Sequence, residues 1–395
     1  MKPPEPYRPD ALETASGLVF GFTPREALPP PAADPVDALE AAILPALLRP
    51  PCLVSFSGGR DSSTILAVAV RLARREGLEL PVPATNRFPG SEGADETQWQ
   101  ERVIVHLGLT EWLRFEFSDE LDSVGPVAMR KLRRYGLLWP FNAHFHVPMI
   151  DEATGGAVLT GVGGDETFGA PRFARAAAVL AGRARPKPRD VLAVSLAASP
   201  PAVRRSVLSR RDPVFLSWLR PDAQQQVWAA WTADTAAEPL RWQSRAAFAR
   251  RRRYIQVGLR SLDCLAAEQR VEIHSPFVDP CFASTIAALP RERRYLTRKA
   301  AMTELFAGLL PEDVLTRRSK SHFDDAFWST YSRRFAAQWD GEGIDPEIVD
   351  GAVLRAEWAK SRPDGRTFLL LQAAALAQES ASAPPELAQA VGGLV

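Results

Sequence analysis

The chain contains little cysteine. Of its 395 residues three are cysteines, and Cys52, Cys264 and Cys281 lie far apart without a C-x-x-C pair. This spacing excludes a disulfide framework and a cysteine-rich zinc site. We therefore expect all three to be buried structural thiols.

The chain also lacks a large net charge and long apolar runs. Its formal net charge is +1, whereas a dedicated nucleic-acid-binding protein is usually distinctly basic. No apolar run reaches the roughly 18 residues of a membrane helix, and the first residues lack the charged start and apolar middle of a secretory leader. These absences predict a cytoplasmic protein that binds neither nucleic acid nor a membrane.

Short apolar runs alternate with helical patterns in the first half of the chain. The apolar runs predict strands at residues 52–56, 82–88, 113–117 and 157–160. Helical patterns separate them at residues 63–75, 95–107 and 121–137. Such alternation predicts an α/β fold, a parallel sheet with helices on both faces, in which ligands gather at the carboxyl ends of the strands.

Composition and pattern divide the chain into three regions. Residues 1–35 are rich in proline and predict an N-terminal arm rather than a domain. We assign residues 36–180 to the α/β domain and residues 190–395 to a mainly helical region that contacts the substrate. With 46% apolar and 24% charged residues, the chain is long enough to bury a sizeable core.

A Gly-rich turn follows the first predicted strand, and residues 57–62 read S-G-G-R-D-S. A turn that delivers a strand to a helix N-terminus presents unpaired N–H groups and the positive end of the helix dipole, which bind phosphate. It therefore predicts a nucleotide-binding loop, with a plain surface turn as the alternative. The chain has no G-x-x-x-x-G-K-[ST] string, and Glu166 stands where the third glycine of a dinucleotide fingerprint would fall.

Several segments together resemble one known family. Residues 57–62 look like the pyrophosphate loop, or PP-loop, of the N-type ATP pyrophosphatases. Residues 159–169, L-T-G-V-G-G-D-E-T-F-G, are similar to the T-G-E-G-x-D-E-x-F-G loop of asparagine synthetases. Residues 274–279, H-S-P-F-V-D, resemble their R-x-P-F-L-D segment, and Lys299 with residues 310–323 matches their closing pattern. The matches follow family order and resemble the synthetase half of the asparagine synthetase family.

The resemblance implies a PP-loop fold and an enzyme that adenylates a carboxylate with Mg·ATP, releases pyrophosphate and forms an amide. It implies that Asp61 and Asp165 hold Mg²⁺, which commonly binds one or two carboxylates together with phosphate oxygens. Taken singly, Asp61 could instead cap a helix, and Asp165 could be a turn residue. The expected ATP and pyrophosphate contacts are Ser55, Ser57, Gly58, Gly59, Asp61, Ser62, Ser63, Thr85, Gly161, Gly163 and Gly164.

Two lysines are candidates for a catalytic role. A cation aimed at the extra charge of a pentacoordinate phosphorus stabilises the transition state more than the ground state. Lys320 fits this role, with a solvated basic loop as the alternative. Lys299 fits pyrophosphate binding equally well, and the sequence does not rank the two.

Two departures separate the chain from asparagine synthetases. Val162 stands where the family carries a Glu, and valine cannot accept a proton from the attacking nitrogen. Glu268, Glu272 and His274 are the alternative bases, unless they are surface or ion-paired side chains. About fifty residues precede the PP-loop and no cysteine follows Met1, so we expect no glutaminase domain. The nitrogen should then come from a substrate amine, free ammonia or a separate protein.

We therefore predict an AMP-forming amide synthetase of specialised metabolism or peptide modification, nearest the β-lactam synthetases and the lasso peptide macrolactam cyclases. Its substrate would be a small molecule or a peptide, with a leader peptide or a partner enzyme as an additional binding partner. The alternatives are a glutamine-independent asparagine synthetase and a catalytically silent nucleotide-binding partner protein. The four arginines at 250–253 predict either a solvated face or a groove for an acidic peptide.

Overall fold

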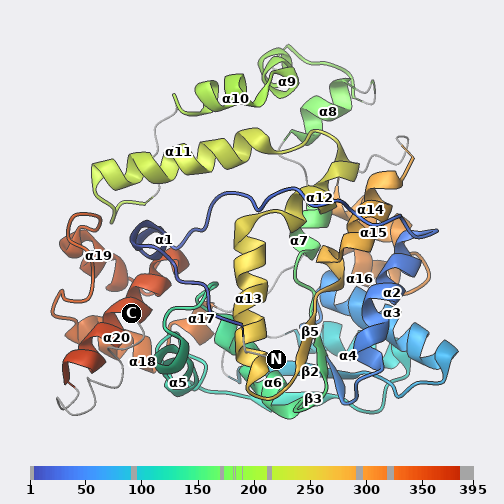
Figure 1. Ribbon diagram of the computed structural model, residues 1–395, viewed down its shortest axis with the longest axis horizontal. Coiled ribbons are helices and arrows are strands. Elements are labelled where there is room, and N and C mark those ends of the chain that lie inside the picture. The colour runs from blue at the N-terminus through green and yellow to red at the C-terminus, as the bar shows by residue number, and fades with distance from the viewer. Residues whose placement is uncertain are drawn as a thin grey trace.

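The computed structural model describes residues 4–89, 96–169, 173–180, 182, 184–188, 190–210, 216–290, 297–317 and 324–382. Within these residues the chain forms a parallel β-sheet surrounded by helices, followed by a mainly helical C-terminal region (Figure 1). The predicted α/β fold is therefore confirmed.

The sheet of the described residues has five strands, all parallel, in the order β3-β2-β1-β4-β5. They are β1 (Cys52–Ser55), β2 (Val82–Arg87), β3 (Leu113–Glu116), β4 (Ala157–Leu159) and β5 (Glu272–His274). The strand order reverses between β1 and β4, which are neighbours in space although β2 and β3 separate them in sequence. Ligands of open parallel sheets bind at such a reversal, beyond the carboxyl ends of the strands.

Helices contain most of the other described residues. Around the sheet lie α2 (Pro35–Leu47), α3 (Arg60–Glu76), α4 (Thr97–Leu107), α5 (Pro126–Tyr135), η2 (Ala143–His146), α6 (Val147–Glu152), α7 (Gly164–Phe168), α13 (Arg253–Ala267), η4 (Pro276–Val278), α14 (Pro280–Ala288), α15 (Arg298–Leu305) and α16 (Glu312–Thr316). The others are α1 (Ala11–Ser16), α8 (Ala174–Leu180), α9 (Asp190–Ala198), α10 (Pro201–Leu208), α11 (Pro221–Ala237), η3 (Trp242–Ser244), α12 (Arg245–Arg250), α17 (Asp324–Phe327), α18 (Thr330–Gln338), α19 (Gly351–Trp358), η5 (Gly365–Thr367) and α20 (Phe368–Ser382). Among the helices described, none has the length and apolar character needed to span a membrane.

Both faces of the sheet are buried, as is usual for parallel sheets. Successive strand residues point to opposite faces. Val54 and Leu159 belong to the core that includes α2 and α3, whereas Leu53 and Val158 belong to the core that includes α6 and α13. A further core away from the sheet joins α1, α5 and α11 to the C-terminal helices α18 to α20.

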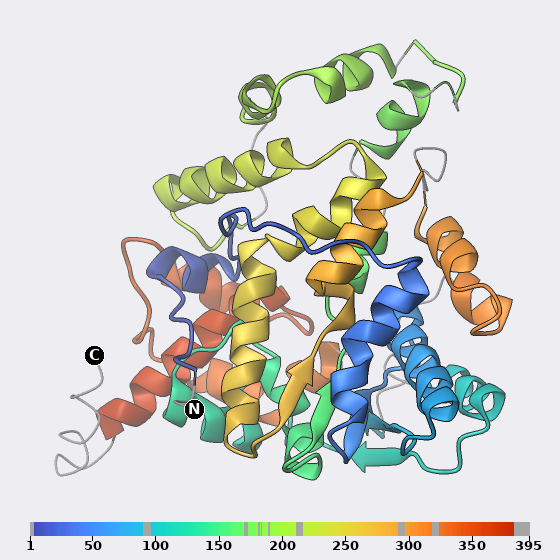
Figure 2. The same ribbon diagram turned by 45° about the vertical axis from the view of Figure 1, so that its right-hand side comes forward.

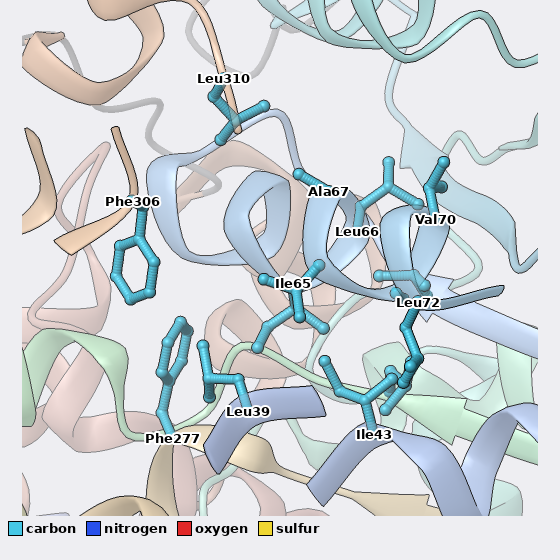
Figure 3. Close-up of a cluster of buried hydrophobic side chains, with 14 of the residues drawn as sticks. Leu39, Ile43, Ile65, Leu66, Ala67, Val70, Leu72, Phe277, Phe306 and Leu310 are labelled. Carbon is cyan, nitrogen blue, oxygen red and sulfur yellow. The ribbon is translucent and has the colours of Figure 1, made fainter. Parts of the chain in front are cut away.

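The core that includes α2 and α3 also contains a residue of α7. Figure 3 shows Ile65 of α3 packed near Leu39 of α2, with Phe277 and Phe306 beside them. Phe168 of α7 lies edge-on to these two rings, at centroid distances of 5.3 and 5.7 Å. Because buried aromatic rings are closely packed, these contacts hold α7 against η4 and the end of α15.

The N-terminal segment is attached to the protein along its length. Its helix α1 begins at a capping box between Asp10 and Glu13, and the chain then passes across the end of α13 to reach α2 (Figures 1 and 2). Arg253 pairs with Glu13 at 2.5 Å, and Arg251 donates to the carbonyl of Thr23 at 3.0 Å. The Pro-rich segment therefore includes a packed helix.

The arginines at 250–253 have a different role from either expectation. Besides the contacts of Arg251 and Arg253, Arg250 pairs with Glu26 at 2.9 Å, and Arg252 lies 3.5 Å from Asp234. The run holds the N-terminal segment instead of forming a solvated face or an open groove. The partners of Arg250, Arg251 and Arg253 lie more than 200 residues earlier, so the local pattern could not reveal them.

The structure confirms the predicted strands and adds one. The strands β1 to β4 end within one residue of the predicted bounds. The three-residue strand β5 was not predicted, because it is too short for a periodic signal and lies within a helical part of the sequence. All three cysteines are free; Cys52 and Cys264 are buried as expected, whereas Cys281 is only half-buried.

Candidate active site

Two loops meet at the carboxyl edge of the sheet. Residues 56–59 connect β1 to α3, and residues 160–163 connect β4 to α7. Because β1 and β4 are parallel neighbours, both loops leave the sheet on the same side. Asp61 lies in the first turn of α3, and Asp165 lies in the first turn of α7.

Serine hydroxyls hold the first loop in shape. The Ser62 hydroxyl accepts from the N–H of Ser57 and donates to the carbonyl of Gly59, both at 3.2 Å. The Ser57 hydroxyl lies 3.2 Å from that of Ser62 and accepts from the N–H of Gly59 at 3.3 Å. The first-turn amides of α3 have no partner within the helix and lie at the positive end of its dipole. The loop therefore suits an anion.

A close contact with α4 supports the same loop. Gly58 has a φ of 77°, and a Cβ at this position would lie 2.7 Å from Cγ of Gln100. The Gln100 amide donates to the carbonyl of Ser57 at 3.3 Å. Only glycine combines this backbone conformation with this approach at low cost.

Three of the predicted contact residues are more enclosed. Ser55 is the half-buried last residue of β1, and Ser63 is fully buried in α3. Thr85 is also buried; its hydroxyl donates to the carbonyl of Phe56 at 2.6 Å and accepts from the indole of Trp112 at 2.9 Å. A contact between the Thr85 hydroxyl and ATP would require an exchange of these partners.

The second loop packs directly on Asp61. A Cβ at Gly164 would lie 2.4 Å from Cγ of Asp61, and one at Gly161 would lie 3.2 Å from its Cβ. Gly163 has a φ of 91°, and its Cβ would meet a methyl group of Val278 at 2.3 Å. The absence of side chains at these glycines lets the two loops approach each other.

The carboxylates of Asp61 and Asp165 converge on one guanidinium. Arg298, the first residue of α15, donates from Nη2 to Oδ2 of Asp61 and from Nη1 to Oδ1 of Asp165. The side chains of Arg298 and Asp61 are each 17% exposed, and that of Asp165 is 57% exposed. The structure thus brings together the two carboxylates expected to bind a metal and adds a cation that the sequence had not indicated.

Burial and neighbouring charges shift the pKa values of Asp61 and Arg298. Burial raises the pKa of Asp61; Arg298 opposes this rise, and Asp165 adds to it. Burial alone would lower the pKa of Arg298, but the attraction of both carboxylates outweighs burial and raises it. Among the described residues, the buried Oδ1 of Asp61 has no hydrogen-bond partner. The Asp61 carboxylate therefore has an unused buried oxygen, and both Arg298 and Arg60 act to lower its pKa.

This set of donors fits Mg²⁺. Magnesium prefers oxygen ligands and commonly binds one or two protein carboxylates together with phosphate oxygens and water. Asp61 and Asp165 would supply the carboxylate oxygens, including the unused Oδ1. Within the described part of the chain no cluster of three or more His, Cys, Asp or Glu side chains could hold a metal. Two carboxylates leave the other coordination positions of Mg²⁺ to phosphate oxygens and water, so they suit a cation that arrives with a bound nucleotide.

Positive charge gathers around the first loop. Burial lowers the pKa of Arg60, and the nearby guanidinium of Arg298 lowers it further, while Asp61 acts in the opposite direction. Arg317 adds another like charge on the same group. A cluster of this kind attracts a polyanion such as a triphosphate.

Arg317 also joins the first loop to α4. It donates to the carbonyl of Gly58 at 3.3 Å, forms an ion pair with Glu96 and lies 4.8 Å from the ring centroid of Trp99. The side chains of the ion pair are each 5% exposed. This buried pair anchors the chain immediately before residues 318–323.

The two candidate lysines differ in what the structure describes. Lys299 is exposed and follows Arg298 in the first turn of α15. Lys320 lies outside the described residues, as do the neighbouring residues of the family's closing pattern up to 323. The catalytic roles of both lysines stay predictions.

Val162 lies half-buried in the second loop and presents no proton acceptor. Its N–H donates to the Thr160 hydroxyl at 3.4 Å. A carboxylate of the adjoining helix, Glu166, accepts from the Tyr254 hydroxyl at 2.9 Å. Burial raises the pKa of Glu166, although the bond from Tyr254 acts in the opposite direction.

Two of the three alternative bases are engaged in ion pairs away from the loops. Glu268 pairs with Lys131 at 2.5 Å. Glu272 pairs with Arg49 at 2.5 Å and lies at the amino end of β5, the end opposite to the loops. His274 ends β5 on the loop side, with Nε2 3.4 Å from a carboxylate oxygen of Glu272.

Sequence reasoning missed Arg298 and the partner of Arg317. The one available signal for Arg298 was Thr297, whose hydroxyl caps α15 by accepting from the N–H of Ala300 at 3.2 Å. A cap predicts where the helix begins, but not which neighbour its first side chain meets. That contact arises because α15 packs against α7 in the folded chain.

Comparison with known proteins identifies the family. The model of the asparagine synthase family matches residues 38–379, which include both loops, α15 and Arg317. A search of curated proteins finds no match. The chain therefore belongs to the asparagine synthase family and is an ATP-dependent ligase that forms carbon–nitrogen bonds.

Proposed function

We propose that the protein is an AMP-forming amide synthetase whose amine is carried by the substrate. The substrate carboxylate attacks the α-phosphorus of ATP, the bond to the β-phosphate breaks, and pyrophosphate leaves. The amine nitrogen then attacks the acyl carbon, AMP departs with the electron pair of the broken C–O bond, and the nitrogen loses a proton. Closure of a lasso-type peptide macrolactam is the sharpest form of this proposal.

The described residues suggest how these steps are divided. The first loop, with Ser57, Gly58 and Gly59, would bind the departing pyrophosphate through hydroxyl and N–H groups. Asp61 and Asp165 would hold Mg²⁺, which when bound neutralises phosphate charge. Lys320 would stabilise the charge of the pentacoordinate phosphorus, as the family resemblance implies.

Val162 is the single observation that carries the choice of nucleophile. An ammonia-using relative has a carboxylate here, next to the attacking nitrogen, and Val162 supplies only apolar surface. An amine tethered within the substrate gains an effective molarity of about 10⁵ M or more over one arriving from solution. The reaction of a tethered amine can therefore tolerate the loss of the base better than the reaction of free ammonia can. The resemblance to lactam-forming relatives, which also lack that Glu, supports the same choice.

The first test offers the enzyme the substrates of the alternative reaction. We would incubate it with Mg·ATP, aspartate and high ammonium, and measure AMP and asparagine together. We expect little of either from the natural protein. Val162→Glu should raise asparagine formation. The matched variant Val162→Gln should not, because glutamine is close to glutamate in volume but cannot act as a base.

The second test offers substrate-borne amines. Peptides with a free N-terminal amine and an internal Asp or Glu would be incubated with Mg·ATP and examined by mass spectrometry. Loss of one water with stoichiometric AMP is the expected result. Robust asparagine formation in the first test would overturn the proposal in favour of a glutamine-independent asparagine synthetase. Absence of AMP formation with every acid and amine pair tested would favour a silent nucleotide-binding partner.

A further inference from the structure

Arg298 holds Asp61 and Asp165 in the way that a small cation would. It does not fork onto one carboxylate, as arginine often does, but gives one N–H group to each of the two. The carboxylates come from different loops, and Arg298 comes from a third element, α15. The guanidinium therefore lies at the point where a shared divalent ion would have to lie.

Arg298 is an incomplete substitute for such an ion. A guanidinium supplies one positive charge at this position, whereas Mg²⁺ would supply two. Oδ1 of Asp61 is buried without a partner among the described residues, and the buried Nε of Arg298 likewise has none there. Buried polar groups are normally paired, so both atoms indicate an arrangement built to change partners.

We propose that Arg298 is a built-in counter-ion that occupies the cation position between Asp61 and Asp165 until Mg·ATP arrives, and that its displacement is a step of nucleotide binding. This inference rests on the metal-binding role of the two carboxylates in the proposed function. It concerns which cation pairs with the two carboxylates before the nucleotide binds, and it does not depend on which acid or amine is joined.

The proposal has a thermodynamic consequence. Arg298 bonds one oxygen of each carboxylate and occupies the space between them, so a metal shared by both carboxylates must bind the minor state in which the guanidinium has moved away. Its apparent affinity is reduced by the population of that state. A metal that arrives with ATP also gains phosphate contacts, and it can displace the guanidinium where the metal alone cannot. The device would therefore favour Mg·ATP over free Mg²⁺.

The competing explanation is that Arg298 is a permanent structural clamp. The two explanations predict different changes in metal affinity when Arg298 is removed. If Arg298 only holds the loops in position, its removal should loosen the site and weaken metal binding or leave it unchanged. If Arg298 competes with the metal, its removal should strengthen metal binding. The melting temperature in EDTA falls in both cases, because two carboxylates lose their counter-ion. Metal affinity is therefore the deciding measurement.

The experiment titrates the full chain with Mn²⁺ alone, without ATP or substrate, and follows free Mn²⁺ by electron paramagnetic resonance. Arg298→Gln should bind Mn²⁺ about tenfold more tightly than the natural protein, a typical size for a coupling of this kind. Arg298→Lys should lie between them, because one ammonium cannot bridge two carboxylates as a guanidinium does. Asp61→Asn combined with Arg298→Gln should abolish the gain and so locate the metal.

Arg133→Gln is the matched control, since Arg133 pairs with Glu379 on exposed helix surfaces outside the site. It removes the same charge and should leave Mn²⁺ affinity unchanged. Equal or weaker binding by Arg298→Gln, with a normal circular dichroism spectrum, overturns the inference. If that variant does not fold, Arg298→Lys decides, and unchanged affinity again overturns it. Because ATP is absent, failure of the amide synthetase proposal would appear separately, in the AMP assays.

Discussion

Arg298 bonds to Asp61 and Arg317 bonds to Gly58, and both arginines pair with carboxylates, but their surroundings differ. Arg317 and Glu96 are each 5% exposed, and the guanidinium also bonds to Gly58 and lies over Trp99. Arg298 shares its charge between two carboxylates, one of which is 57% exposed. The first pair is closed on all sides, and the second is open to solvent on one side.

The difference separates a permanent contact from an exchangeable one. Breaking a closed pair leaves a buried charge with no replacement partner, which is strongly unfavourable. Breaking an open pair is easier when a stronger cation takes over the carboxylates. An arginine paired with a carboxylate would therefore anchor the loop at Arg317 and, under the proposal above, would give way to a ligand at Arg298.

The largest expected effect is on catalysis at the open side. Asp61→Asn and Asp165→Asn should each reduce substrate-dependent pyrophosphate release by about a thousandfold or more, because a bound metal supplies several kcal/mol of charge stabilisation. Circular dichroism should show an intact fold. Near-normal turnover by either variant would show that the residue is not a metal ligand. The Arg298 pair would then differ from the Arg317 pair in exposure but not in function.

The closed side should respond in stability instead. Arg317→Met should lower the free energy of unfolding by about 3–5 kcal/mol, because it leaves the buried carboxylate of Glu96 unpaired. The double variant with Glu96→Gln should recover part of that loss, and urea denaturation measures both. A loss below about 1 kcal/mol would show that the pair is not closed in solution.

Lys320, three residues after Arg317 in the sequence, is tested by catalysis instead. Lys320→Ala should lower kcat about a hundredfold, the size typical of a donor that acts on transition-state charge, with little change in ATP affinity. Lys299→Ala is the matched variant for the exposed lysine beside Arg298. A change confined to ATP affinity would assign Lys320 to ground-state binding, and a larger kcat loss at Lys299 would reverse the two roles.

The parts of this site that follow from sequence are those encoded locally. The strand, the turn and the helix start around residues 57–62 lie within a few positions of one another, so their pattern predicts the loop. The pairs of Arg298 with Asp61 and of Arg317 with Glu96 join residues more than 200 positions apart. Neither periodicity nor a motif indicates which distant side chain will pair with a given residue. The strand β5 was missed for another reason, because three residues carry too little pattern.

The smallest effect is expected at Arg133 and Glu379, an ion pair whose side chains are 59% and 41% exposed. The pair has good geometry, with N–O distances of 2.6 and 2.8 Å, yet water screens it and competes for both partners. Arg133→Gln should therefore change the free energy of unfolding by less than about 1 kcal/mol in urea denaturation. A loss approaching that of Arg317→Met would mean that bidentate geometry, and not enclosure, determines how strongly these arginines hold. The distinction drawn between Arg317 and Arg298 would then need another basis.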